Sequence, residues 1–177
     1  MLDTVGTALM PMTLGFLMRG DRVWLGLKKK KVAAGFLNGA GGKIDPGYTE
    51  LSCLKKEIFD EWGVTIRAGT AQKMGVVDFY NEQEDGSSLD VRVHVYTISE
   101  WHGEPKESDE MGAPVPYHLN QVPYDQMMIG DRPWVQWVLF GKRVRAVVRY
   151  KTDKTLVSAV QPRVLTNKDL NLLRHTA

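Results

Sequence analysis

The segment GGKIDPGYTELSCLKKEIFDEWGV, residues 41–64, decides the fold, because in it a glycine-rich loop runs directly into an amphipathic helix. Thr49 is a residue type that favours the helix N-cap, and Gly63 suits the left-handed position that ends many helices. Apolar residues recur between them at spacings of three and four, which is the period of one buried helix face. They are Leu51, Leu54, Ile58 and Trp62.

Three acidic residues of this helix stand at positions i, i+3 and i+4, so they project from one side of its last two turns. They are Glu57, Asp60 and Glu61. Their mutual repulsion and the negative end of the helix dipole both disfavour this arrangement. A divalent cation would relieve both, and carboxylates on a fixed surface suit Mg²⁺, with Mn²⁺ as the alternative. A solvated acidic helix end is the other interpretation, but the preceding glycine-rich loop, whose backbone can approach a ligand closely, favours a metal site.

The rest of the chain predicts strands around this one central helix. Alternating or short apolar runs bounded by turn residues indicate strands at 12–18, 23–27, 64–66, 73–79, 89–98, 144–150 and 155–160. A second, short helix is expected at 133–140, with a proline in its first turn. We therefore predict the α/β class, a layered sandwich rather than a doubly wound series.

Composition and charge limit the functions that fit. The chain of 177 residues is 43% hydrophobic and 25% charged, which is typical of one globular domain. A net charge of +2 gives no electrostatic reason to bind DNA, whereas a single nucleotide is an anion that the chain could hold. Cys53 is the sole cysteine, which suits a reducing compartment. Without a basic leader or an apolar run of about 18 residues, a cytoplasmic protein with no membrane partner is expected.

Residues 41–64 resemble the Nudix box, which reads Gly, five residues, Glu, seven residues, then Arg-Glu-aliphatic-x-Glu-Glu-x-Gly-aliphatic. The positions that match it directly are Gly42, Glu57, Ile58, Glu61, Gly63 and Val64. Asp60 keeps a carboxylate where the box has glutamate, whereas Tyr48 replaces its first glutamate and Lys56 its arginine. A pattern of this length with so many matches is far more specific than a lone glycine motif.

The resemblance extends to the oxidised-purine nucleoside triphosphatases of the MutT type, the animal 8-oxo-dGTPases in particular. The stretches VWLGLKKKKVAAGFLNGAGGK, DVRVHVYTI and EPKESDEM, and the region from Val122 to Trp134, resemble those enzymes in order and spacing. The resemblance implies a Nudix-type α/β/α sandwich with a mixed β-sheet over residues 1–160, and it leaves 161–177 as a tail of unassigned role. It also implies Mg²⁺-dependent hydrolysis of a nucleoside triphosphate to the monophosphate and pyrophosphate.

The resemblance implies a metal site and a general base. The metal ligands would be the Gly41 carbonyl oxygen and the side chains of Glu57, Asp60, Glu61 and Glu110. Water must attack a phosphorus surrounded by negative oxygens, so cations that screen the approach are needed. Glu61 is the preferred general base and Glu57 the alternative. Glu110 fits a solvated acid of an acidic loop equally well.

The base-binding side carries over less completely. The family's pocket positions correspond here to Thr13, Lys28, Asn38, Phe79, Met128 and Asp131. Asn38 and Asp131 would read a purine edge through hydrogen bonds, whereas Phe79 could equally belong to the core. Met128 stands where the family has a stacking tryptophan, and Gly130 where it has one of two neighbouring aspartates. Triphosphate hydrolysis therefore carries over better than a preference for 8-oxo-dGTP.

Other features leave alternatives open. We hypothesise that a Tyr48–Lys56 contact replaces the box ion pair and leaves the metal triad alone. The lysine run 28–31 is a solvated basic loop or contains a phosphate-facing lysine. Four cations would also suit a longer polyphosphate, so a dinucleotide polyphosphate or an RNA cap is the alternative substrate, and a capped end is the sole nucleic acid expected. A weakly catalytic nucleotide-binding module is the non-enzymatic alternative. The sequence leaves monomer and dimer equally open.

Overall fold

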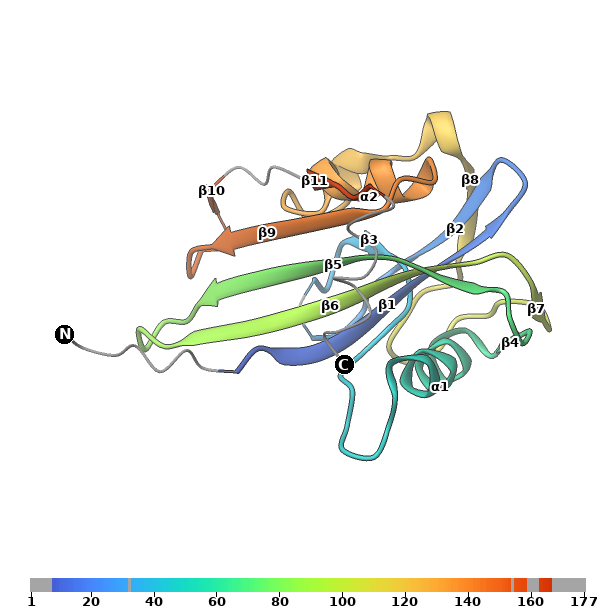
Figure 1. The fold of residues 1–177 in the computed structure, drawn as a ribbon, viewed down its shortest axis with the longest axis horizontal. Coiled ribbons are helices and arrows are strands. Elements are labelled where there is room, and N and C mark those ends of the chain that lie inside the picture. Colours follow the sequence, from blue (N-terminus) through green and yellow to red (C-terminus); the bar gives the residue numbers. More distant parts are fainter. Residues whose placement is uncertain (1–7, 32, 154, 159–162, 167–177) are drawn as a thin grey trace.

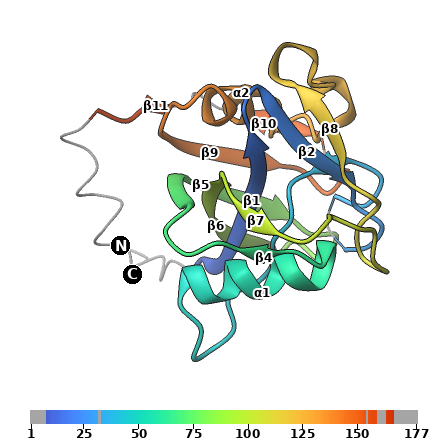
Figure 2. The same cartoon turned by 90° about the vertical axis from the view of Figure 1, so that its right-hand side faces the viewer.

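The computed structural model describes residues 8–31, 33–153, 155–158 and 163–166. Their arrangement is a three-layer sandwich in which a twisted sheet separates α1 from α2 (Figures 1 and 2). The helices are α1 (Glu50–Trp62) and α2 (Arg132–Leu139), with short 3-10 turns at Leu119–Gln121 and Tyr124–Gln126. The strands are β1 (Met10–Arg19), β2 (Arg22–Leu27), β3 (Leu37–Asn38), β4 (Thr65–Ile66), β5 (Ala71–Glu82), β6 (Ser88–Ile98), β7 (Trp101–His102), β8 (Val115–His118), β9 (Val144–Tyr150), β10 (Leu156–Ser158) and β11 (Arg163–Val164).

The main sheet is mixed, as predicted. Its strands follow the order β10-β9-β5-β6-β1-β2-β3, with β8 paired to β2 and β11 paired to β9. The pairs β1–β6 and β5–β9 are parallel, whereas β1–β2 and β5–β6 are antiparallel. Strands β4 and β7 form a separate small ribbon beyond the C-terminal end of α1. The predicted α/β/α sandwich with a mixed sheet is therefore confirmed.

Helix α1 begins and ends where the sequence indicates. Thr49 Oγ1 accepts a hydrogen bond from the Ser52 amide at 3.1 Å, and Ser52 Oγ accepts one from the Thr49 amide at 2.9 Å, which completes a capping box. At the other end Gly63 has a φ of 70° and donates its N–H to the Phe59 carbonyl.

One expected core residue of α1 lies outside the core. Leu54, Ile58 and Trp62 are fully buried, but Leu51 is 40% exposed. Polar contacts hold this first turn on the sheet, because Glu50 accepts hydrogen bonds from Lys73 and Tyr96 at 3.0 and 2.6 Å. Leu51 is therefore left at the surface.

Two apolar cores lie on opposite faces of the sheet. One packs against α2 and is built on Phe16, Val77, Val95 and Trp134. The other packs against α1 and includes Leu17, Leu54, Ile58 and Ile98. Neighbouring strand residues such as Phe16 and Leu17 enter different cores because side chains alternate along a strand.

The remaining predicted elements are present with shifted ends. The turn expected at 81–88 is shorter, because Asn81 pairs with Leu89 and Glu82 with Ser88. Strand β10 lies within the predicted strand 155–160, whose last two residues lie outside the described part of the chain. Among the described helices, none is long and apolar enough to cross a membrane.

Candidate active site

The acidic side of α1 lies against the glycine-rich loop that precedes it. The loop runs beside β1, where the Thr13 amide donates to the Gly42 carbonyl and the Gly15 amide to the Ala40 carbonyl, both at 2.8 Å. The Gly41 amide donates to Glu61 Oε2 at 2.9 Å. A Cβ on Gly42 would lie 2.5 Å from Glu57 Oε2, so a side chain at this position would displace the Glu57 carboxylate. One short segment thereby positions two of the predicted catalytic carboxylates.

Each predicted acidic metal ligand contacts a lysine ammonium group. Glu61 Oε1 lies 3.1 Å from Lys28 Nζ, and both side chains are largely buried. Glu110 accepts from Lys31 at 2.8 Å. Lys56 Nζ lies 2.6 Å from Asp60 Oδ2 and 3.5 Å from Glu57 Oε1. The site thus places hard oxygen donors beside monovalent cations.

Burial and charge act in opposite directions on the key acid. Glu61 is 3% exposed, and this burial raises its pKa, although the Lys28 ammonium and the Gly41 amide pull it down. At the surface, the hydrogen bond from Lys31 lowers the pKa of Glu110 and raises that of Lys31. The negative charges of Glu57 and Glu61 also raise the pKa of Lys31, so its ammonium group interacts with acids of α1 as well as with Glu110.

The loop after β2 presents the lysines in an unusual backbone conformation. Lys31 and Ala33 have φ angles of 63° and 68°, a left-handed region that side chains other than glycine seldom adopt. The turn is held by the Gly35 amide bonding to the Lys28 carbonyl at 2.8 Å, and by the Lys29 amide bonding to the Glu110 carbonyl at 2.9 Å. Lys29 Nζ contacts Glu107 at 3.0 Å. The lysine run is therefore not merely solvated, since three of its four members contact carboxylates.

The residues present suit a divalent cation. The donors are the oxygens of four carboxylates, which hard cations prefer, and the three lysine ammonium groups that contact them leave one negative charge unbalanced. Among the residues that the structure describes, no three His, Cys, Asp or Glu side chains are close enough to form a metal cluster. Each carboxylate instead contacts a lysine ammonium group, and Glu57 and Asp60 share that of Lys56.

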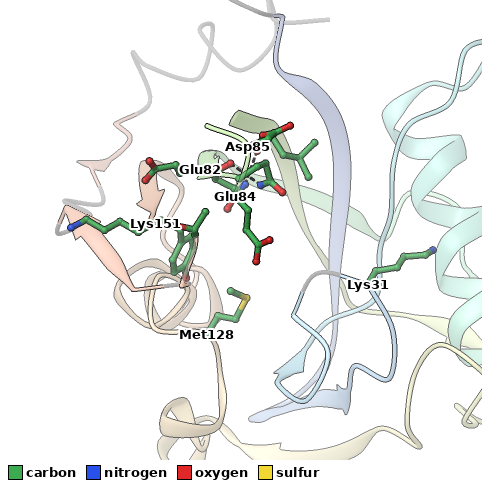
Figure 3. A pocket seen from close by; sticks show the side chains of 11 residues that line it. Lys31, Glu82, Glu84, Asp85, Met128 and Lys151 are labelled. Carbon is green, nitrogen blue, oxygen red and sulfur yellow. Dashed lines mark hydrogen bonds between the residues drawn. The ribbon is translucent and has the colours of Figure 1, made fainter. Parts of the chain in front are cut away.

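A cavity of about 560 Å³ shares one residue, Lys31, with this site, and the other residues around it come mainly from the β5–β6 hairpin and the end of β9. Figure 3 shows acidic side chains of the β5–β6 hairpin at one end, with Met128 below them. Lys31 also lines the cavity, and its side chain extends away from these acids toward α1 (Figure 3). Because Lys31 contacts Glu110, it links the cavity to the acidic site. The lining residues are Lys31, Asn81, Glu82, Gln83, Glu84, Asp85, Leu89, Met128, Tyr150, Lys151 and Thr152.

Four of the predicted base-binding residues lie on the α2 face of the sheet. Asn38 Nδ2 donates to Asp131 Oδ2 at 3.3 Å. Asp131 is buried, and burial raises its pKa to about 7. Phe79 and Met128 are partly buried and pack against the α2-side core. Hydrogen-bonding groups thus lie next to an apolar wall, as a base-binding site requires.

Relatives of known activity cover most of this chain. No protein-family model matches it. Proteins named oxidized purine nucleoside triphosphate hydrolase from Danio rerio and Mus musculus are each 32% identical over 146 residues, which is 82% of this chain and 90% of the relative. The chain belongs to the Nudix hydrolase family. The MutT protein of Bacillus halodurans shares the Nudix fold, with a TM-score of 0.71 and 24% identity over 87% of this chain and 97% of that one.

In this Nudix hydrolase, two residues that were predicted to bind the base, Thr13 and Lys28, lie away from Asn38 and Asp131. Thr13 faces α1, where its Oγ1 is 3.7 Å from Cys53 Sγ, because strand alternation points it away from the α2 face. Lys28 joins the acidic site through Glu61. The structure therefore does not bring either residue together with Asn38 and Asp131.

The expected role of Lys56 needs correction. Its ammonium group contacts Asp60 and Glu57, so it does not leave the carboxylate triad alone. The cause is the i, i+4 spacing to Asp60, which places the two side chains on one helix face. Tyr48 is 45% exposed in the loop before α1.

Sequence reasoning missed Tyr150, which ends β9 and lines the cavity. Its position in an apolar strand indicated only a core residue. The contacts of Lys31 and Lys56 with the acids were missed too. For the lysine run at 28–31, a phosphate-facing lysine was one of two alternatives.

Proposed function

We propose that this Nudix hydrolase cleaves a purine nucleoside triphosphate to the monophosphate and pyrophosphate. The observation that carries the proposal is that one residue, Lys31, both lines a cavity of about 560 Å³ and contacts Glu110 of the acidic site. Cavities of this volume are typical of small-molecule sites. The relatives from fish and mouse support the substrate class, since their names specify oxidised purine nucleoside triphosphates.

Nudix hydrolases generally use divalent metal ions, and Mg²⁺ is proposed here, with Mn²⁺ as the alternative. The Gly41 carbonyl oxygen and the side chains of Glu57, Asp60, Glu61 and Glu110 would hold the metal. When bound, it would screen the phosphate charge and lower the pKa of the attacking water. The lysines that now contact these acids would be released toward the polyphosphate.

Glu61 is the proposed general base, and Glu57 is the alternative. Burial raises the pKa of Glu61, which makes its carboxylate a stronger base than an exposed one. The Gly41 amide and Lys28 orient its two oxygens from opposite sides. An oriented carboxylate can take a proton from water without first rearranging its own hydrogen bonds.

The charges around the cavity suggest how the nucleotide lies. Glu82, Glu84 and Asp85 at the hairpin end would repel a triphosphate, whereas Lys31 at the other end would attract it. The base would then lie near Met128 and Asp131, on the α2 side. This orientation leads the phosphates toward the carboxylates of α1.

The test is a panel of nucleotides incubated with Mg²⁺ or Mn²⁺, with the products separated by chromatography. The panel includes canonical and 8-oxo purine triphosphates, pyrimidine triphosphates, a dinucleotide tetraphosphate and capped RNA. We expect monophosphate and pyrophosphate in equal amounts from purine triphosphates, fastest with one of the purines. Metal-dependent cleavage of the cap or dinucleotide alone would point to the alternative substrate, and no product from any compound would contradict an enzymatic role.

A further inference from the structure

Tyr150 lines the cavity, and two elements fix the position of its hydroxyl group. Tyr150 is the last residue of β9 and is 5% exposed, and it lines the cavity with Met128. Its Oη accepts a hydrogen bond from the Gly130 amide at 2.7 Å. Gly130 lies in the loop before α2, between Met128 and the buried Asp131. The hydroxyl group is therefore held beside the predicted base-reading residues.

The contact between Tyr150 and Gly130 depends on both residues. A Cβ added to Gly130 would overlap the Tyr150 hydroxyl oxygen and lie 2.5 Å from Val148 Cγ1. No side chain at 130 can therefore coexist with this position of the tyrosine. The tyrosine hydroxyl occupies the volume that a side chain at position 130 would otherwise take.

The geometry leaves the hydroxyl proton free to be donated. A phenol has one O–H to donate, and here its oxygen already accepts from Gly130. Among the described residues, none accepts a hydrogen bond from the Tyr150 hydroxyl group. Burial and the nearby Asp131 raise the pKa of Tyr150 to about 12, so the proton stays on the oxygen near neutral pH. A fixed, buried donor thus lies beside the Asp131 carboxyl group.

We propose that Tyr150 is a specificity-determining residue whose hydroxyl donates a hydrogen bond to the carbonyl oxygen at C6 of a purine base. A hydroxyl donor beside the Asp131 carboxyl group, whose oxygen can accept a hydrogen bond, matches the edge of a 6-oxopurine, which offers a carbonyl oxygen next to an N1–H group. Adenine offers an amino group next to an unprotonated nitrogen, which is the reverse order. Tyr150 therefore favours guanine-type and hypoxanthine bases over adenine. This inference rests on the proposed function of the same site.

The test compares dITP with dATP, two triphosphates that differ in the base at C6 and in the proton on N1. The kcat/KM ratio of the two is measured for wild type and Tyr150→Phe, which removes the hydroxyl and keeps the ring. Because both substrates are measured on one preparation, the ratio is independent of the folded fraction. We expect wild type to prefer dITP, and Tyr150→Phe to reduce the ratio by about 5- to 20-fold, mainly through KM.

Tyr124→Phe is the matched control. The Tyr124 hydroxyl is also buried, it has no hydrogen-bond partner within the described part of the chain, and the residue does not line the cavity. Its removal is expected to leave the dITP to dATP ratio unchanged. A wild-type preference for dATP, or an unchanged ratio in Tyr150→Phe, would overturn the assignment of Tyr150.

A binding measurement separates this inference from the proposed function. Calorimetric titration of dIMP and dAMP needs neither turnover nor a metal ion. If wild type hydrolyses no triphosphate, the proposed function fails, and the dIMP to dAMP affinity ratio still decides the role of Tyr150. A smaller ratio in Tyr150→Phe than in wild type supports the role, whereas equal ratios contradict it.

Discussion

At the scale of single residues, the site is a set of acids each paired with an ammonium group. The pair between Glu61 and Lys28 is largely buried, whereas that between Asp60 and Lys56 is half exposed. Exposed pairs contribute little to stability, so a divalent cation can displace Lys56 at small cost. A buried acid that loses its partner destabilises the folded protein strongly. Lys28 is therefore expected to hold Glu61 in place before the metal binds.

Lys56→Ala is expected to bind Mn²⁺ more tightly than wild type, by about 2- to 5-fold, because a half-exposed competing charge is removed from Asp60 and Glu57. Titration of free Mn²⁺ by electron paramagnetic resonance measures this affinity directly. Lys55→Ala is the control, since Lys55 neighbours Lys56 in the chain but forms no ion pair with a described residue. Weaker Mn²⁺ binding in Lys56→Ala would mean that Lys56 orients the acids instead of competing for them.

Asp131→Asn is expected to change how stability depends on pH. Burial raises the pKa of Asp131 from 3.8 to about 7, so the folded protein binds this proton more tightly than the unfolded chain. The stabilising contribution of protonated Asp131 is fully present below pH 3.8 and is lost as the pH rises from there to about 7. The variant, which cannot ionise, should be more stable than wild type at pH 8, by roughly 1–4 kcal/mol, and show no gain near pH 4.

Urea unfolding at both pH values measures this difference. The groups that face Asp131 include the Trp134 indole, the Asn38 amide and the Tyr150 phenol, and none of these ionises between pH 4 and 8. Asp125→Asn, at an exposed position in the same region, is the control. If Asp131→Asn and wild type differ in stability equally at pH 4 and pH 8, ionisation of Asp131 does not destabilise the folded protein.

At the scale of elements, the glycine-rich loop and α1 act as one unit. The segment from Asn38 to Lys43 runs alongside β1. It begins with the Asn38 side chain, which is predicted to bind the nucleobase, and its glycines farther along contact Glu61 and Glu57. Its backbone can lie this close only because glycines stand there. The distance between base and phosphate sites is therefore set by one short segment.

Gly42→Ala is expected to reduce turnover by at least about tenfold while unfolding at nearly the wild-type urea concentration, because its Cβ displaces the Glu57 carboxylate. Gly47→Ala is the matched control, since Gly47 has a φ of 90° with nothing near its absent Cβ. That variant should lose about 1 kcal/mol of stability and keep its activity. The opposite pattern would show that Gly42 serves the fold and not the carboxylate.

Elements with local signals were predictable from sequence, and those that depend on distant partners were not. Thr49 and Gly63 marked both ends of α1 because caps are local. The resemblance implied a place for Lys28 in the base pocket, and its contact with Glu61 had no local signal because the two residues lie 33 positions apart in the chain. Tyr150 gave no signal, since its hydroxyl has a role only when β9 meets the loop before α2.

At the scale of the whole molecule, the site spans both faces of the sheet. Glu57, Asp60 and Glu61 belong to α1 and Asp131 precedes α2, and Figure 2 shows these two helices on opposite sides of the sheet. The parallel β1–β6 pair brings β1, and with it the glycine-rich loop, to the centre of the sheet. A nucleotide that reaches from one side to the other would bind only the folded chain, so substrate and metal together should raise the melting temperature.

The most direct test of the central claim is the initial rate of pyrophosphate release from dGTP with Mg²⁺, measured for wild type, Glu61→Gln and Glu107→Gln. Glu107 is an exposed acid that contacts Lys29 away from α1, so its variant controls for the loss of one charge. We predict that wild type and Glu107→Gln release pyrophosphate at similar rates and that Glu61→Gln is slower by about 100-fold or more. Equal rates in all three proteins, or release of orthophosphate in place of pyrophosphate, would contradict the account.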